Sequence, residues 1–457
     1  MTPSIPKGSR DFNAETLYKR QFILNTIQAT YELFGFEPIE TPTMEKLDIL
    51  TGKYGEEGDK LLFKVLNSGD YLAKANAEAI DARNSAKATR SISEKGLRYD
   101  LTVPFARYVA QHRNDITFPF KRYQMQPVWR ADRPQKGRYR EFYQCDADVI
   151  GTNSLIAEFE FLQIYDHVFR KLGIRGYEIK LNNRKILAGI AEAIGTSEKF
   201  TDLTVAIDKL DKVGVEGVQK ELANRGFDPT QQDAISQILG ITGCNEDRLK
   251  AIEALIGDTE IGQQGIAEMR ELLELLEAVT VNKDKIGVDI TLARGLTYYT
   301  GTIFEVKVPE SGIGSISGGG RYDDLTSMFG LNDVSGVGIS FGLDRIYDVM
   351  EILSLWPERL KRRSPTKILV TYMDDAVKSN VIDFMEKLRF NGINAEMYLE
   401  KTKLGKQFKY ANDKGIPIVV VIGSEEVSKG KFQMKFMESG QQQELEPAYI
   451  INALKRL

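Results

Sequence analysis

The chain has 457 residues, more than one ordinary hydrophobic core organises, so two or three domains are expected. Its hydrophobic fraction of 42% and charged fraction of 28% are typical of a globular protein in water. The formal net charge of −4 means that any contact with nucleic acid depends on local basic patches, which argues against a protein that coats DNA. Two cysteines and two histidines, without a Cys-x-x-Cys or Cys/His cluster, predict no disulfide framework, no metal site and no His-based triad.

No stretch reaches the roughly 18 apolar residues that a membrane span requires, and the start of the chain has no apolar run. We therefore expect a cytoplasmic protein without a membrane partner. Its chemistry must rest on carboxylates, arginines and backbone groups.

The first 100 residues predict a helix, an extended segment and an irregular stretch. The helix runs from Glu15 to Phe34, and residues 36–43 are extended because two prolines exclude helix there. A strand is expected over Leu61–Leu66, and the composition of Ala73–Gly96 favours a mobile insertion or a frayed helix. The apolar residues expected on the inner face of the first helix are Leu17, Ile23, Leu24, Ile27, Tyr31 and Phe34.

A strand end and a helix start meet at Asp100. The strand is expected to end at this residue, and Thr102 is expected to be the N-cap of the next helix, with Pro104 in its first turn. Taken alone, a carboxylate at this point favours the helix through its dipole.

The stretch from Lys121 to Arg140 is strongly basic. It has seven cations against the single carboxylate Asp132, and it predicts a hairpin with strands over Tyr123–Trp129 and Tyr139–Val149. Polar groups on one face of a strand either meet solvent or line a ligand cavity. A guanidinium group can bind two phosphate oxygens at once. We therefore predict a polyphosphate site, with an exposed basic hairpin as the alternative. The residues that share this face of the second strand are Phe142, Gln144, Asp146 and Asp148.

The middle of the chain predicts scaffold elements. A helix begins near Thr152 and ends at Gly173, a strand covers Tyr177–Asn183, and the pattern is helical and charged from about 184 to 278. No recognisable chemistry lies in this helical block. Cys244 is expected to be a small buried residue rather than a nucleophile.

Three glycine-marked segments follow. Two strands are expected around Arg294-Gly295, and the triple glycine at 318–320 marks a place where the backbone approaches another group closely. A glycine-rich strand over Val337–Gly342 precedes a helix that starts near Leu343. Taken alone, Arg345 in that helix would be a surface cation.

The C-terminal part, after a linker at 362–365, predicts a small α/β domain with a mainly parallel sheet. Five lysines between 401 and 414 suit phosphate contacts and a solvated helix face equally well. The expected strands are Lys367–Tyr372, Ala395–Leu399 and Ile416–Ile422, and the expected helices are Asn380–Phe390 and Leu404–Lys414.

Several strings in the chain resemble one known family. Trp129-Arg-Ala-Asp-Arg-Pro-Gln-Lys-Gly-Arg-Tyr-Arg-Glu-Phe142 resembles the second motif of class II aminoacyl-tRNA synthetases, in the form that histidyl-tRNA synthetases carry. Arg294-Gly-Leu-Thr-Tyr-Tyr299 and Ser317-Gly-Gly-Gly-Arg-Tyr322 resemble the two signatures that separate histidyl-tRNA synthetases from the rest of the class. The segment Val337–Tyr347 resembles the third motif, and the helix and extended segment at 15–43 resemble the first, which forms the family's dimer interface.

The resemblance implies an α+β fold, with an antiparallel-sheet class II catalytic core, a helical insertion and a C-terminal α/β anticodon-binding domain. The implied boundaries are 1–183 and 281–360 for the two parts of the core, 184–280 for the insertion and 365–457 for the anticodon-binding domain. The implied activity is the attachment of L-histidine to tRNA(His) by a homodimer, with ATP and Mg²⁺, through a histidyl-adenylate. The family's insertion reaches toward the tRNA acceptor arm, but a bundle that only stabilises the sheet would show the same pattern.

The resemblance also implies roles for single residues, and none of them is a protein ligand to a metal. Arg130 and Arg294 would grip the α-phosphate as the catalytic pair, Asp132 would lie at the adenine, and Arg138 and Arg345 would hold the outer phosphates with Mg²⁺. Asp100 and Gln144 would take the ammonium of histidine, Asp148 and Tyr299 the imidazole, with Arg294 and Tyr322 completing the site. Arg133, Gln135 and Lys136 would contact the acceptor end of tRNA.

Three alternatives to this interpretation are less consistent with the sequence. A non-catalytic paralogue that regulates histidine biosynthesis would lack the motif arginines and the C-terminal domain, and both are present here. A class II synthetase for another amino acid is opposed by the two histidine signatures, and a plain RNA-binding protein by the grouping of arginines with carboxylates. One departure concerns Asp100, Asp132, Asp148 and Asp344, where many bacterial relatives have glutamates whose carboxylates reach about 1.5 Å further.

Overall fold

The computed structural model describes residues 2–52, 54–279, 281–293, 298–360 and 364–456. It comprises two compact units. The first holds the described residues up to Asp11 and from Arg20 to Leu355, and the second holds Phe12–Lys19 and the described residues from Trp356 onward. Among the described residues, no helix combines the length and apolar character that a membrane crossing needs.

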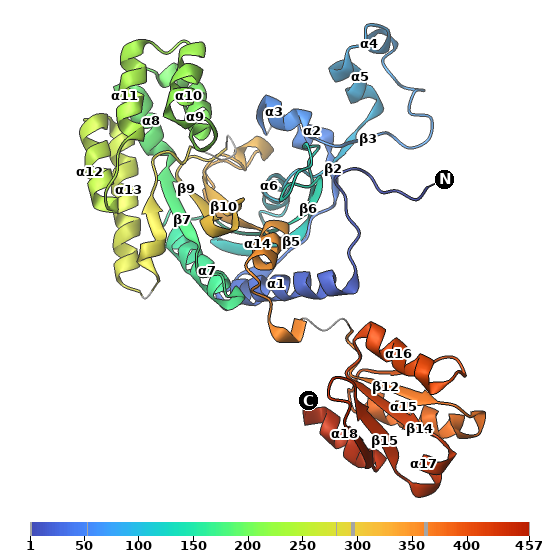
Figure 1. The fold of residues 1–457 in the computed structure, drawn as a ribbon. Helices are drawn as coiled ribbons and strands as arrows, with labels where there is room; N and C mark the ends of the chain where they lie inside the picture. The colour runs from blue at the N-terminus through green and yellow to red at the C-terminus, as the bar shows by residue number, and fades with distance from the viewer. Residues whose placement is uncertain (1, 53, 280, 294–297, 361–363, 457) are drawn as a thin grey trace. The chain divides into compact units, whose positions relative to one another are not determined.

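The first unit is built on a sheet that has eight strands within the described residues, in the order β1-β5-β6-β11-β10-β9-β7-β8 (Figure 1). The outer pairs β1–β5 and β7–β8 are parallel and the inner pairs are antiparallel. This arrangement confirms the predicted α+β class. The strands are β1 (Glu37–Pro38), β5 (Phe120–Trp129), β6 (Glu141–Ile150), β7 (Glu178–Asn183), β8 (Ile286–Val288), β9 (Thr302–Val308), β10 (Ile313–Tyr322) and β11 (Gly336–Gly342).

Helix α7 (Ile156–Leu172) and the part of α1 (Ala14–Leu33) that begins at Arg20 run along one face of this sheet (Figure 1). The ring of Phe341 on β11 lies 6.2 Å from the ring of Tyr31 on α1 and 5.3 Å from that of Tyr165 on α7. Because strand residues alternate between faces, the side chains next to Phe341 in sequence point to the opposite side, where the site lies. The prediction that Leu17 faces inward is wrong, since its side chain is half exposed.

A small three-stranded sheet stands beside the core within the described residues, in the order β2 (Met44–Lys46), β4 (Lys95–Leu97), β3 (Lys64–Val65). Helices α2 (Leu47–Leu50) and α3 (Gly55–Lys60) separate β2 from β3. The stretch expected to be mobile or a frayed helix forms two short helices, α4 (Ala77–Asp81) and α5 (Ser85–Ile92). Each begins at an asparagine N-cap, because the side chains of Asn76 and Asn84 accept the N–H of Ala79 and of Lys87.

The helix after Asp100, α6 (Thr102–Gln111), begins differently from the prediction. Thr102 is its first helical residue and not its N-cap, which is Leu101 and makes no side-chain cap. The Asp100 carboxylate accepts the Val103 N–H at 3.2 Å in place of a threonine hydroxyl. Asp100 therefore fixes the helix start and faces the site at the same time.

The helical block gathers beside β7 and has its own core (Figure 1). Gly189 of α8 packs against α13, since a Cβ on Gly189 would lie 2.5 Å from the Cα of Gly262. The prediction that Cys244 is buried is wrong, because it is exposed just before α12. The helices are α8 (Arg184–Ala193), α9 (Phe200–Asp208), α10 (Leu210–Asn224), α11 (Pro229–Leu239), α12 (Asn245–Ile256) and α13 (Glu260–Glu277).

The strands predicted around Arg294 are not hairpin partners. β8 pairs with β7, whereas β9 lies between β7 and β10. Arg294 and Gly295 lie outside the described residues. The strand and helix predicted at 337–343 are confirmed as β11 and α14 (Leu343–Ile352).

The second unit contains a sheet of five strands within its described residues, β13-β12-β14-β15-β16. β12 is parallel to β13 and to β14, but β14–β15 and β15–β16 are antiparallel, so the mainly parallel sheet of the prediction is a mixed one. The strands are β12 (Ile368–Tyr372), β13 (Ala395–Met397), β14 (Ile418–Ile422), β15 (Phe432–Phe436) and β16 (Gln442–Leu445). The helices are α15 (Lys378–Phe390), α16 (Leu404–Lys414), α17 (Ser424–Lys429) and α18 (Pro447–Arg456). Residues 362 and 363 of the predicted linker lie outside the described residues, and the four-part domain division stays a prediction.

Candidate functional site

A cavity of about 50 Å³ lies on the sheet face opposite α1 and α7. In the strand register Asp148 of β6 is opposite Gly338 of β11, and Asp146 is opposite Ser340. The polar face predicted for the second hairpin strand therefore lines a cavity, with Asp146 and Asp148 buried and Gln144 partly exposed. The lining residues are Asp100, Thr102, Arg130, Gln144, Asp146, Asp148, Tyr298, Tyr299, Gly318, Tyr322, Gly338, Ile339 and Ser340.

Asp148 is held from two sides. Its Oδ2 lies 2.6 Å from the guanidinium of Arg122 on β5, and its Oδ1 accepts the Tyr322 hydroxyl at 2.7 Å. The Arg122 guanidinium also lies 4.0 Å from the centre of the Phe105 ring. Burial raises the pKa of the Asp148 carboxyl, and Arg122 opposes that rise.

Asp100 is the second buried carboxyl of the cavity. Its Oδ1 accepts the hydroxyl of Tyr54 at 3.0 Å, and Tyr54 packs against the ring of Tyr99 with 4.4 Å between centroids. Burial raises the pKa of Asp100, while the positive charge of Arg130 counteracts it. Sequence reasoning missed Tyr54, because the segment that carries it has no motif and reaches Asp100 only through the fold.

Asp146 is the third buried carboxyl, and it was not assigned a role from the sequence. Its position on the same strand face as Gln144 and Asp148 was the available indication. Burial raises its pKa to about 7, the nearby charge of Asp148 adds to the rise, and Arg122 and a hydrogen bond from Ser340 oppose it.

Glycines in β10 and β11 make room for the side chains that form the cavity. A Cβ on Gly338 would lie 2.1 Å from Oδ1 of Asp148, and a Cβ on Gly320 would lie 2.9 Å from the ring of Tyr299. Both contacts are far below van der Waals distance. The close approach predicted at the triple glycine is thus made in part by protein side chains.

Arg130 is the member of the basic stretch that lines the cavity. Its Nε donates to the carbonyl oxygen of Tyr99 at 3.0 Å, and its guanidinium lies 4.3 Å from the Tyr99 ring centre and 5.1 Å from that of Phe142. The two rings hold a guanidinium in place by cation–π contact. A fixed cation beside a cavity is suited to an anion.

The loop between β5 and β6 holds the predicted nucleotide residues Asp132 and Arg138, and Arg345 of α14 contacts it. Asp132 pairs with Arg138 at 2.7 Å, and the Nε of Arg345 on α14 donates to the carbonyl oxygen of Gly137 at 2.9 Å. Gly137 has φ +73°, which a tight turn between Gln135 and Arg138 requires. The exposed side chains of this loop are Arg133, Gln135, Lys136 and Arg138.

The seven cations of the basic stretch do not form one site, which corrects the sequence interpretation. Lys121 pairs with Glu160 on α7 at 2.5 Å, on the opposite face of the sheet. Arg122 is buried under the cavity with Asp148. Strand alternation sends neighbouring cations to opposite faces, and a composition count cannot separate them.

The structure therefore divides the predicted residues into two groups. One group lines the cavity: Asp100, Arg130, Gln144, Asp148, Tyr299 and Tyr322. The other group lies at the loop that carries Gly137: Asp132 and Arg138 belong to this loop, and Arg345 contacts it. Arg294 lies outside the described residues. Within the described ranges, no group of three or more His, Cys, Asp or Glu residues is placed to hold a metal ion.

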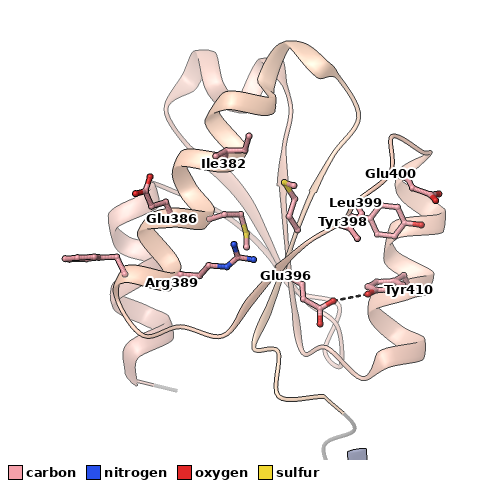
Figure 2. A pocket seen from close by; sticks show the side chains of 11 residues that line it. Ile382, Glu386, Arg389, Glu396, Tyr398, Leu399, Glu400 and Tyr410 are labelled. Atoms are coloured by element: carbon pink, nitrogen blue, oxygen red, sulfur yellow. Dashed lines mark hydrogen bonds between the residues drawn. The ribbon is translucent and has the colours of Figure 1, made fainter.

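The second unit has a larger hollow of about 890 Å³ at the outer strand β13. Figure 2 shows Ile382, Glu386 and Arg389 along α15 on one side and Tyr410 of α16 on the other. Glu396 of β13 accepts the hydroxyl of Tyr410 at 2.9 Å. Phe390, which also lines the hollow, is 91% exposed.

The chain was compared with known proteins. A family model described as "Histidyl-tRNA synthetase" matches residues 75–346, and one described as "Anticodon binding domain" matches residues 367–457. Two relatives named histidine--tRNA ligase, from Christiangramia forsetii and Phocaeicola vulgatus, are 53% and 51% identical, each over 99% of both chains. The crystal structure of histidyl-tRNA synthetase from Nostoc sp. PCC 7120 has a TM-score of 0.82 and 31% identity, and the match covers 100% of this chain and 99% of that one.

Proposed function

The chain belongs to the histidyl-tRNA synthetase family of enzymes, which attach histidine to tRNA, and we propose that it does so through a histidyl-adenylate made from ATP. In the first step a carboxylate oxygen of L-histidine attacks the α-phosphorus of ATP, and pyrophosphate leaves. In the second step a ribose hydroxyl at the end of tRNA(His) takes the histidyl group, and AMP leaves. Neither step needs a covalent bond to the protein, so catalysis consists of positioning and charge neutralisation.

The observation that carries this proposal is the cavity itself. Asp100 and Asp148 are buried carboxyls in its lining, and the fixed guanidinium of Arg130 stands in the same lining. An amino acid has a cation and an anion on the same carbon atom. Asp100 at the ammonium group, Asp148 at the imidazole and the guanidinium of Arg130 at the α-phosphate would hold histidine and ATP against each other in line.

On the nucleotide side, Arg130 would bind the α-phosphate. Arg294 would bind it from the other side, an assignment that rests on the family signature alone. Arg138 would leave Asp132 when the outer phosphates of ATP offer more negative charge, and Arg345 would hold the loop against them. Since Mg²⁺ keeps several waters and binds through phosphates, we propose that it enters as part of the nucleotide substrate.

On the amino-acid side, Asp100 and Gln144 would bind the ammonium group. Asp148, fixed by Arg122 and Tyr322, would accept an N–H of the imidazole, and Tyr299 would meet the other ring nitrogen. A planar side chain without ring nitrogens would offer neither Asp148 nor Tyr299 a hydrogen bond in exchange for the water that it displaces. Such a site discriminates far better than an apolar pocket of the same shape.

Three further points belong to the proposal. The second unit would bind the anticodon of tRNA, since the anticodon-binding model covers 367–457. Two chains would form a homodimer through α1 and β1, where Leu33 is 65% exposed. A cytoplasmic location suits the free thiols of Cys145 and Cys244.

The test is ATP–pyrophosphate exchange by the purified protein with each of the twenty amino acids, without tRNA. Exchange with histidine alone is the expected result. Exchange with another amino acid would overturn the substrate assignment, and folded protein without any exchange would favour a regulatory, non-catalytic paralogue.

A further inference from the structure

Asp146 is a buried carboxyl that none of the assigned roles uses. Asp146 is 2% exposed and lines the cavity, and its Oδ1 has no hydrogen-bond partner among the described groups. A buried acceptor without a partner is costly, so such groups in native sites commonly meet a ligand or an ordered water.

Ser340 links the positions of Asp146 and Gln144. It lies opposite Asp146 in the register, where its hydroxyl helps to lower the pKa of the Asp146 carboxyl, and that hydroxyl accepts the Gln144 Nε2 at 2.9 Å. A hydroxyl has one hydrogen to donate, and a carboxylate accepts it. The amide nitrogen of Gln144 is therefore directed at Ser340, and its Oε1 is buried without a partner among the described residues.

We propose that Asp146 is a substrate-binding residue whose carboxylate accepts a hydrogen bond from the α-ammonium group of the amino acid, beside Asp100 and the Gln144 amide oxygen. This inference rests on the proposed function of the same cavity. An ammonium group has three N–H donors, and the three side chains offer one acceptor each. Because Ser340 accepts the Gln144 Nε2, the Gln144 oxygen is left for the substrate.

The neighbours of Asp146 place it at the ammonium end of the site rather than at the imidazole. Asp148 already has the guanidinium of Arg122 at 2.6 Å and the hydroxyl of Tyr322 at 2.7 Å. Asp146 lies instead opposite Ser340, the residue whose hydroxyl accepts the Gln144 Nε2. Arg122 and Arg130 act on Asp146 and Asp100 without a direct salt bridge among the described residues, so these two carboxyls are the ones that a cation of the substrate can pair with.

The experiment compares the wild-type protein with Asp146→Asn in ATP–pyrophosphate exchange. Asparagine keeps the shape and removes the charge, so the KM for histidine is expected to rise about tenfold or more, as for other charge-assisted hydrogen bonds. The KM for ATP is expected to stay within about twofold. The matched control is Asp166→Asn, a buried carboxyl on α7 bonded to Tyr177, for which both KM values are expected to stay near wild type.

Two analogues identify the group that Asp146 contacts. L-Histidinol keeps the ammonium and the imidazole, whereas imidazole-lactate has a hydroxyl in place of the ammonium. Asp146→Asn is expected to weaken histidinol binding about tenfold and to leave imidazole-lactate binding nearly unchanged. Calorimetric titration gives both affinities even if the variant has lost exchange activity, and a thermal melt confirms that it is folded.

An unchanged histidine KM in Asp146→Asn would overturn the inference. Equal weakening of both analogues would also overturn it, because it would place Asp146 at the imidazole. Absence of histidine-dependent exchange in the wild-type protein is a different outcome, which refutes the proposed function itself.

Discussion

Arg122 on β5 and Asp148 on β6 are direct partners in the strand register, and their side chains form an ion pair of 2.6 Å under the cavity. The side chain of Arg122 is fully buried and that of Asp148 is 3% exposed. The negative charge of Asp148 is thus balanced by a positive charge inside the protein before any ligand binds. A residue of the proposed histidine site is at the same time part of the internal structure of the sheet.

Replacing Arg122 by Met is expected to destabilise the protein strongly. The substitution leaves Asp148 buried without its cation, which typically lowers the free energy of unfolding by about 3–5 kcal/mol. Urea denaturation followed by circular dichroism measures the change. The double variant Arg122→Met with Asp148→Leu is expected to recover part of the loss, and a double variant less stable than the single one would argue against the pair as the cause.

Replacing Arg130 by Ala is expected to slow adenylate formation. Removal of one fixed charge that stabilises a transition state costs about 10²-fold to 10³-fold in kcat. Single-turnover formation of adenylate measures this step, with calorimetric titration for histidine affinity, which should change little. Arg170→Ala, an exposed arginine on α7, is the control. If the histidine affinity fell as much as the rate, Arg130 would be assigned to binding of the amino acid and not of the phosphate.

Replacing Gly338 by Ala is expected to abolish histidine-dependent exchange while the protein remains folded. The added Cβ would lie 2.1 Å from Oδ1 of Asp148, so either the carboxylate or the strand must shift. Gly314→Ala on β10 is the matched control, because nothing lies within 4 Å of the added Cβ there. Exchange assays and melting curves of both variants check the expectation, which fails if Gly338→Ala retains the wild-type KM for histidine.

Asp146 is expected to make stability depend on pH. Its pKa is about 7 in the folded protein and about 3.9 in an unfolded chain, so between these values the folded state binds more protons. Wild-type stability therefore falls as pH rises through this window, by up to about 4 kcal/mol from this group alone. Asp146→Asn is expected to be more stable than wild type at pH 8, and the difference should shrink toward pH 5.

Urea titrations of both proteins from pH 5 to pH 8 test this dependence. The charged neighbours of Asp146 are present in both proteins, so the difference between the two curves isolates its titration. A constant difference across the range would mean that Asp146 does not titrate there. The ionisable groups around it are Asp100, Asp148, Arg98, Arg122, Cys145, Tyr31, Tyr165 and Tyr299.

Replacing Phe390 by Ala is expected to weaken tRNA binding without affecting adenylate formation. Phe390 is 91% exposed at the hollow of the second unit, so its truncation costs little stability, whereas an unpaired base can stack on its ring. The loss of one stacking contact is worth about 1–3 kcal/mol, which is a rise of about 5-fold to 150-fold in KM for tRNA. Tyr449→Ala on α18, another exposed aromatic residue, is the control. Equal aminoacylation kinetics of both variants would exclude the hollow from tRNA contact.

The sequence by itself determined the family and most of the elements that surround the site. The glycine-rich strand and helix at 337–343, the hairpin that contains Arg130 and the alternation of Gln144, Asp146 and Asp148 all follow from local patterns. Period-two alternation and turn residues are properties of neighbouring positions, so a single sequence shows them. The glycines near Tyr322 were recognised as places of close approach for the same reason.

Only the tertiary structure decided which side chains meet. The pairing of Arg122 with Asp148 depends on the register of two strands, and the bond from Tyr54 to Asp100 joins segments 46 residues apart. The exposure of Cys244 depends on how α12 packs. The antiparallel strands of the second unit depend on strand pairing that the local sequence pattern does not reveal. Such contacts arise from packing between distant segments, and the free energy that selects them belongs to the whole fold rather than to any one stretch of sequence.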